Sequence, residues 1–254
     1  MSITTKEVII FDTEVKPNRF LFRARSKKTG HKVALWHHIP GDMEKLRRLL
    51  RNDQLIWVGF NSRNFDWPLV TKACSGASTE AIYALAQEII ENRKPAWMTY
   101  RDAGLEAPDV DTIDLIEVAP GVMISLKLYG ARMGMQTIFD SPFHHSEELD
   151  EWQLDTELAY CDNDIDTTDA LFESQREAIL MREKMGDKYG IDLRSKSDAQ
   201  MAEAIIAKKM SLYGKGGTNI PQTVGYKPPS FIQPQSPILR DILLRVIKTC
   251  FVVK

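Results

Sequence analysis

The sequence predicts an α/β protein with a central mixed five-stranded sheet flanked by helices, and two observations support this. Residues 8–11 and 55–60 are continuous apolar runs, which are typical of strands that are covered on both faces. A hairpin pattern follows the first run, whereas segments with helical spacing separate the later ones. The chain has 254 residues, 43% of them hydrophobic, so it can form one large domain plus an extension.

Each element of the first half has a local reason. Two apolar stretches flank the polar turn at 26–30, which indicates a hairpin. Pro68 suits the first turn of a helix, and Ser78 or Thr79 can cap another that runs to about Asn92. The expected strands are 8–11, 20–25, 32–36 and 55–60, and the expected helices are 43–52, 66–73 and 79–92.

The second half is more helical. Pro95, Gly104 and Pro108 mark a loop that leads to a short extended segment at 110–112. A short helix is expected at 125–133, followed by an irregular stretch, and the residues from 147 to 185 are strongly helical. That helix is expected to begin near Asp150 and to end at Gly186.

The last 60 residues differ in character from the rest. Ser197 and Asp198 cap a helix through Met210, and a Gly- and Pro-rich stretch from 214 to 237 is typical of an extended linker. An apolar helix from Ile238 and a strand-like segment at 250–253 close the chain. We expect a domain at 1–192 and an extension at 193–254. A further expectation, which stays open, is that the extension begins another domain of a longer protein.

The composition bears on the binding partners and the cellular compartment of the protein. The net charge of −2 neither indicates nor excludes nucleic-acid binding, because an acidic site can offset a basic groove. Three widely spaced cysteines favour a reducing compartment and argue against a zinc site or a disulfide framework. With no signal peptide and no apolar run of about 20 residues, we expect a cytoplasmic protein without a membrane partner.

Two acidic motifs follow apolar runs. Asp12 and Glu14 are alternate residues of an extended segment, so their carboxylates project together about 7 Å apart. Such a pair is common by chance, and taken alone it is better explained as a polar strand exit or turn. In the second motif, 61–66, Asp66 is either a third carboxylate of a site or simply a helix cap.

The third motif lies in the long helical segment. Tyr160 and Asp164 are four residues apart and therefore share one helix face. Asp162 and Asp166 point elsewhere, and we expect them to be solvated. A phenol next to a carboxylate suits the positioning of a water molecule beside a bound metal ion.

Together the motifs are more specific than each one alone. Asp12, Glu14, Asp66 and Asp164 could supply the hard oxygen ligands of two divalent ions, Mg²⁺ or Mn²⁺, about 3.5–4 Å apart. Without metal ions, four such carboxylates would raise one another's pKa values. The combination predicts a metal-dependent nuclease.

These motifs resemble those of the DEDD superfamily of 3′–5′ exonucleases, in the subgroup with tyrosine in the third motif. The resemblance covers roughly residues 6–185. It implies a ribonuclease-H-like fold and two metal ions, with Tyr160 orienting the attacking water and with Asn61 and Phe65 contacting the terminal nucleotides. By the same resemblance the metal ligands are Asp12, Glu14, Asp66 and Asp164.

Two looser similarities indicate the kind of protein in which this activity would occur. Residues 125–134 and 197–200 resemble segments of bacteriophage-type members. This favours the exonuclease part of a phage DNA polymerase-like protein, which would act in the cytoplasm of a bacterial host.

Other residues could contact the substrate. Thr13, Arg63 and Lys127 complete the substrate-binding candidates, and a 3′-end exonuclease needs such phosphate contacts. Arg132 is a further candidate, and Arg19, Arg23 and Arg25 are weaker ones, although solvated surface charge explains all of these cations as well. Three further expectations are a core position for Trp67, a surface loop at 144–145 and a solvated helix face bearing Asp111, Asp114 and Glu117.

Three functions remain open. The first is a DNA 3′–5′ exonuclease for proofreading or end trimming. The second is an RNA-processing exoribonuclease, because contacts to the 2′-hydroxyl group cannot be recognised in these motifs. The third is a catalytically idle module that binds a polymerase or another replisome protein through the apolar C-terminal segment.

Overall fold

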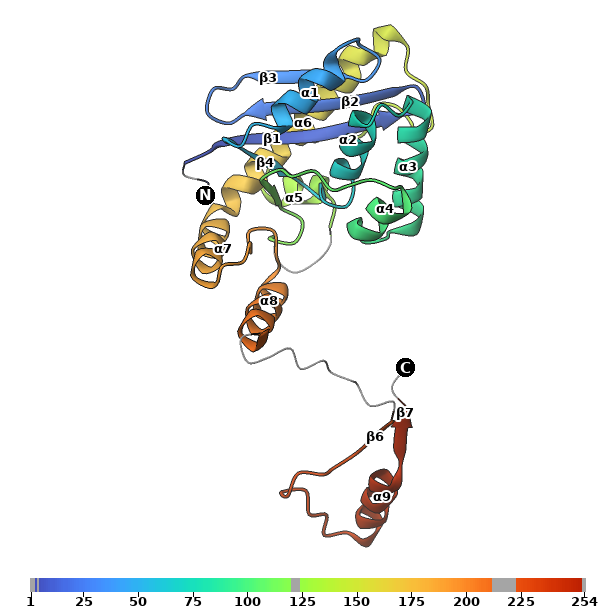
Figure 1. Ribbon diagram of the computed structural model, residues 1–254, viewed down its shortest axis with the longest axis vertical. Helices are drawn as coiled ribbons and strands as arrows, with labels where there is room; N and C mark the ends of the chain where they lie inside the picture. The colour runs from blue at the N-terminus through green and yellow to red at the C-terminus, as the bar shows by residue number, and fades with distance from the viewer. Residues whose placement is uncertain (1–2, 4, 120–123, 212–222, 253–254) are drawn as a thin grey trace. The chain divides into compact units, whose positions relative to one another are not determined.

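The computed structural model describes residues 3, 5–119, 124–211 and 223–252 and divides the chain into two compact units, 1–206 and 207–254. The first unit is built on a five-stranded sheet of order β3-β2-β1-β4-β5 (Figure 1). Strands β1, β4 and β5 are parallel, and β2 is antiparallel to both of its neighbours. The bounds are β1 Glu7–Lys16, β2 Arg19–Ser26, β3 Lys32–Trp36, β4 Leu55–Gly59 and β5 Thr112–Asp114. The predicted α/β fold with a mixed five-stranded sheet is confirmed, in a ribonuclease-H-like arrangement.

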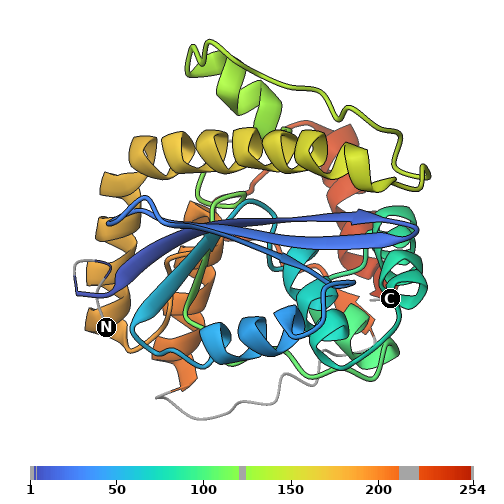
Figure 2. The same cartoon turned by 90° about the horizontal axis from the view of Figure 1, so that it is seen from above.

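Helices cover both faces of this sheet. Figure 2 shows α6 along one face and α1, α2 and α3 on the other. The helices are α1 Asp42–Leu50, α2 Asp66–Cys74, α3 Thr79–Asn92, α4 Ala96–Asp102, α5 Leu126–Arg132, α6 Leu154–Ser174, α7 Arg176–Tyr189 and α8 Asp198–Ser211, with a 3₁₀ turn at Glu151–Gln153.

The alternation of side chains along β1 decides on which face of the sheet each residue lies. Phe11 packs with Trp57 and Trp67 in the core beneath α1–α3, with its ring centroid 4.6 Å from that of Trp67. Ile10 points the other way and packs in a second core with Ile165 of α6. Asp12 and Glu14 have the parity of Ile10, so they lie on the face that α6 covers.

The long helical pattern is interrupted, and the expected end at Gly186 is wrong. Helix α6 ends at Ser174, and α7 continues to Tyr189, where Gly190 adopts a left-handed φ of 65°. The N–H of Ile191 donates to the Gly186 carbonyl at 3.1 Å, which closes the helix in a Schellman motif. Gly186 is needed for a different reason, because a Cβ there would lie 2.6 Å from the Ile191 oxygen.

The loop expected after Asn92 contains a helix. Pro95 is the N-cap of α4, and its carbonyl accepts the N–H of Met98 at 2.9 Å. Pro95 therefore precedes a helix instead of preventing one. The extended segment expected at 110–112 is a strand at Thr112–Asp114, and the helix face predicted for Asp111, Asp114 and Glu117 is wrong.

Residues 193–206, expected in the extension, lie in the first unit. Arg194 forms an ion pair with Asp111 at 2.7 Å, and Arg182 pairs with Asp198 at the same distance. The predicted cap of α8 is present, since the N–H of Gln200 donates to Ser197 Oγ at 3.3 Å.

The second unit pairs β6 (Thr223–Gly225) with β7 (Cys250–Val252) in antiparallel fashion, with α9 (Pro237–Lys248) between them in the chain. The helix and the terminal strand were predicted, whereas β6 falls in the stretch expected to be linker. The linker residues 214–217 lie outside the described residues. Across the described ranges, we find no helix whose length and apolar character would suffice to cross a membrane.

Candidate metal centre

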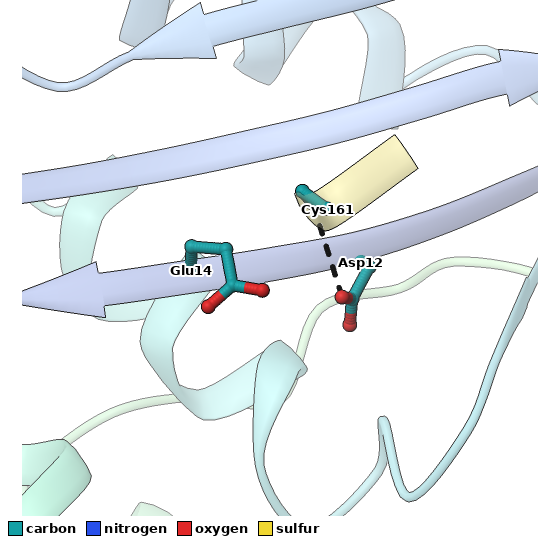
Figure 3. Close-up of side chains that lie close together, drawn as sticks. All are labelled: Asp12, Glu14 and Cys161. Carbon is teal, nitrogen blue, oxygen red and sulfur yellow. Dashed lines mark hydrogen bonds between the residues drawn. The ribbon is translucent and has the colours of Figure 1, made fainter. Parts of the chain in front are cut away.

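The first motif lies inside β1 and does not follow it as expected, because the strand runs on to Lys16. Asp12 and Glu14 project toward α6, where they meet Cys161 (Figure 3). One potential ligand atom from each of the three residues lies within 4.8 Å of the others, and Cys161 Sγ is 3.8 Å from Asp12 Oδ2. Among the residues that the structure describes, this is the only such group of three or more His, Cys, Asp or Glu side chains.

Cys161 was missed as a site residue, although its position offered a signal. It lies three residues before Asp164, so both belong to one face of α6. Its side chain is fully buried. Sequence reasoning treated the cysteine only as an indicator of the redox compartment.

The second motif forms the turn between β4 and α2. The turn is tight, because a Cβ on Gly59 would lie 2.7 Å from the Cβ of Ser62. Phe65 occupies the N-cap position of α2, so the alternative that Asp66 is only a helix cap is wrong. The buried Asp66 carboxylate instead accepts a hydrogen bond from Thr13 Oγ1 at 2.5 Å. The hydroxyl of Thr13, a substrate-binding candidate, therefore donates to one of the predicted metal-binding carboxylates.

Asp114 holds this turn in place and was missed by sequence reasoning. It is 2% exposed at the end of β5, beside β4. Its carboxylate accepts the backbone N–H of Asn61 at 2.8 Å and that of Arg63 at 2.9 Å. Asn61 has a left-handed φ of 58°, and Asp114 stabilises that conformation. The signal was its place at the carboxyl end of a parallel strand, where α/β proteins commonly build sites.

We expect Asp114→Ala to lower the free energy of unfolding by about 2–4 kcal/mol, because the backbone N–H groups of Asn61, Arg63 and Ile116 lose their acceptor. Urea denaturation measures this change. Asp109 is an exposed acid in the segment before β5, and Asp109→Ala should stay within about 0.5 kcal/mol of wild type. Equal stability of the two variants would contradict the role assigned to Asp114.

In the third motif, Tyr160 and Asp164 interact as their spacing predicts. A side-chain hydrogen bond joins them, and Lys127 Nζ lies 5.2 Å from the centre of the Tyr160 ring. Lys127 also pairs with the exposed Asp140 at 3.2 Å. Burial raises the pKa of Asp164, while the hydrogen bond from Tyr160 and the charge of Lys127 oppose that rise.

The four predicted carboxylates act on one another electrostatically. Burial, followed by the charges of Asp66, Glu14 and Asp164, raises the pKa of Asp12 well above its usual value. Burial also raises the pKa of Asp66 to about 7, against the hydrogen bond from Thr13. Asp66 and Asp164 fall outside the 4.8 Å group. The charges of the four carboxylates therefore act on one another, but in this geometry the four do not form the ligand set of a single ion.

This donor set fits divalent cations. Carboxylate oxygens are the ligands that Mg²⁺ and Mn²⁺ prefer. Buried carboxylates with raised pKa values gain most from a cation, which removes both their mutual repulsion and the cost of burying charge.

Glu157 is a further buried carboxylate that sequence reasoning missed. It lies one turn before Cys161 on α6, is 0% exposed and stands 3.5 Å from Lys16 Nζ. After burial, the charge of Glu157 is the largest cause of the raised pKa of Glu14. Its signal was its sequence position, seven residues before Asp164 and therefore on the same helix face.

The three arginines of β2, which are the weaker phosphate-binding candidates, form ion pairs with acidic side chains of the protein itself. Arg23 forms two hydrogen bonds with Asp162, at 2.7 and 2.9 Å, and Arg25 bonds to Asp166 and Asp169. The expectation that Asp162 and Asp166 are merely solvated is therefore wrong, because they hold α6 against β2. Arg19 pairs with Glu151 at 3.0 Å.

The remaining candidates are more scattered. Arg63 lines a pocket of about 730 Å³ whose lining includes none of the four carboxylates. Phe65 is half-buried and packs against the core that contains Trp67, which is 2% exposed as predicted. Arg132 is exposed on α5, and His144 and His145 lie on an exposed loop, also as predicted.

The chain matches no protein-family model and no curated protein. The assignment of the site therefore depends on its own geometry and chemistry.

Proposed function

We propose that the protein is a two-metal-ion 3′–5′ exonuclease that hydrolyses the terminal phosphodiester of DNA. One observation carries the proposal. The buried Asp66 and the half-buried carboxylates of β1 and α6 interact through their charges in one cluster, and a phenol is hydrogen-bonded to one of them. A structural role alone does not account for four clustered carboxylates with so little exposure, because each raises the cost of ionising the others.

Each residue has a chemical task in this proposal. Asp12, Glu14, Asp66 and Asp164 would hold two Mg²⁺ or Mn²⁺ ions, which supply a Lewis acid for the phosphate and an acidified water. Burial and the nearby carboxylates raise the pKa of Tyr160, so its phenol stays protonated at neutral pH. The phenol donates to Asp164, and its oxygen can accept a hydrogen bond from the attacking water and orient it.

Substrate contacts come from the same region. Lys127, beside Tyr160, provides positive charge for the scissile phosphate. Asn61 and Phe65 in the turn before α2 are the proposed contacts to the terminal nucleotides, and Arg63 is a more distant phosphate contact. In the fuller proposal the chain is the proofreading or end-trimming part of a phage DNA polymerase-like protein in the bacterial cytoplasm. The similarities at 125–134 and 197–200 support that setting.

A 5′-labelled single-stranded oligonucleotide tests the activity. With Mg²⁺ or Mn²⁺ we expect stepwise shortening from the 3′ end, and EDTA should abolish it. No shortening with either ion, together with no Mn²⁺-induced rise of the melting temperature, would refute the proposal and favour the idle interaction module. A matched RNA strand that is shortened faster than DNA would instead identify an exoribonuclease.

A further inference from the structure

We propose that Asp12, Glu14 and Cys161 form a binding site for a borderline-soft divalent cation such as Zn²⁺ or Cd²⁺, which competes there with Mg²⁺. The inference rests on the proposed function, in which Asp12 and Glu14 are metal ligands. It adds a thiol ligand to the carboxylates and with it a sensitivity to thiophilic ions.

The distances fit a single ion. Zinc bonds to sulfur at about 2.3 Å and to carboxylate oxygen at about 2.0–2.2 Å, so two ligand atoms of a tetrahedral zinc ion stand about 3.5 Å apart. The ligand atoms of Asp12, Glu14 and Cys161 all lie within 4.8 Å of one another. The 3.8 Å between Cys161 Sγ and Asp12 Oδ2 is already close to that tetrahedral spacing, and rotation of the long Glu14 side chain brings its carboxylate to the same ion. Figure 3 shows the Cys161 thiol directed at the Asp12 carboxylate.

Glu157 adds a buried negative charge next to the trio. Its side chain is fully buried, and neither carboxylate oxygen has a hydrogen-bond partner among the described residues. Lys16 at 3.5 Å is its ion-pair partner. Its charge acts on Glu14, so an additional carboxylate stands beside the trio and strengthens the attraction for a positive ion.

The ligand types decide which ion is preferred. A thiolate is a soft ligand that favours Zn²⁺ and Cd²⁺, whereas Mg²⁺ favours oxygen. On binding, the ion forms a bond to sulfur and the thiol proton leaves to solvent, with no change of oxidation state. A soft ion held in this way occupies carboxylates that the hydrolytic ions need, so it inhibits the exonuclease.

The test uses the full chain with Cys74→Ser and Cys250→Ser, which leaves Cys161 as its only thiol. Cadmium is added in the absence of nucleic acid, and the ultraviolet thiolate-to-cadmium absorption is recorded. We expect one equivalent of cadmium to produce the band. A further Cys161→Ser change should abolish the band and weaken cadmium binding, measured calorimetrically, at least about tenfold, since even outer-shell changes cost 10–100-fold. Cys161→Ala provides a second variant, and circular dichroism verifies that each is folded.

The outcomes separate this inference from the proposed function. Absence of the band in the parent chain, or equal cadmium affinity in the Cys161 variants, overturns the thiol site. If Mg²⁺-dependent shortening is present in that case, the proposed function stands and only this inference fails. A cysteine-dependent band, with cadmium inhibiting the parent chain competitively with Mg²⁺, supports it.

Discussion

Asp164→Ala is expected to slow shortening of the 3′ end on the order of 10³-fold, which corresponds to about 4 kcal/mol of lost transition-state stabilisation. The half-buried carboxylate belongs to the acidic cluster, and Tyr160 is hydrogen-bonded to it. Its removal therefore takes away a metal ligand and the partner that orients the phenol. Single-turnover kinetics on a labelled DNA strand at saturating Mn²⁺ measure the rate of the chemical step.

Asp155→Ala is the matched control for this prediction. Asp155 is an exposed carboxylate in the first turn of the same helix, so the variant should cleave at nearly the wild-type rate. The double variant Asp12→Ala/Glu14→Ala should lose at least as much activity as Asp164→Ala, and less than the product of separate losses, because the ligands act as a unit. Undiminished cleavage in either ligand variant would exclude the proposed site.

Asp66→Asn is expected to stabilise the metal-free protein, increasingly so as the pH rises from 5 to 8. Burial raises the pKa of Asp66 from 3.8 to about 7 in the folded protein. The folded state thus holds a proton that the unfolded chain has already lost, so this group favours folding below about pH 4. That contribution disappears as the pH rises through 7. Asparagine has the same shape, can accept from Thr13 and never ionises.

The effect should approach a few kcal/mol at pH 8, since moving one pKa from 3.8 to about 7 is worth on the order of 4 kcal/mol. Urea denaturation in EDTA at several pH values measures it, with the exposed Asp187→Asn as control. A stability difference between Asp66→Asn and wild type that is constant from pH 5 to 8 would contradict the ionisation cost. Saturating Mn²⁺ should reverse the order, because wild type keeps the ligand that the ion binds.

Local patterns were sufficient for much of the fold. Continuous apolar runs marked β1 and β4, and a polar turn marked the β2–β3 hairpin. The shared face of Asp12 and Glu14 follows from the two-residue period of a strand, and that of Tyr160 and Asp164 from the helical period. The ends of elements were less predictable. The sequence predicted a helix end at Gly186, but the missing Cβ of this residue instead permits a close approach of the Ile191 backbone.

The composition of the site depended on contacts that no local pattern contains. Asp114 is joined to a turn 51–53 residues away, and Cys161 meets a carboxylate 149 residues earlier in the chain. Asp162 was expected to be solvated and Arg23 was a weaker phosphate-binding candidate, yet the two are 139 residues apart and bind one another.

By itself, the sequence determined the α/β class and the faces on which the motif residues lie, because both depend on short-range periodicity. Only the tertiary structure decided that Thr13 binds Asp66, that Asp114 supports the second motif, and that Cys161 and Glu157 join the carboxylates. The physical reason is that the packing of β1 against α2 and α6 sets these distances. That packing depends on side chains from the whole sheet domain.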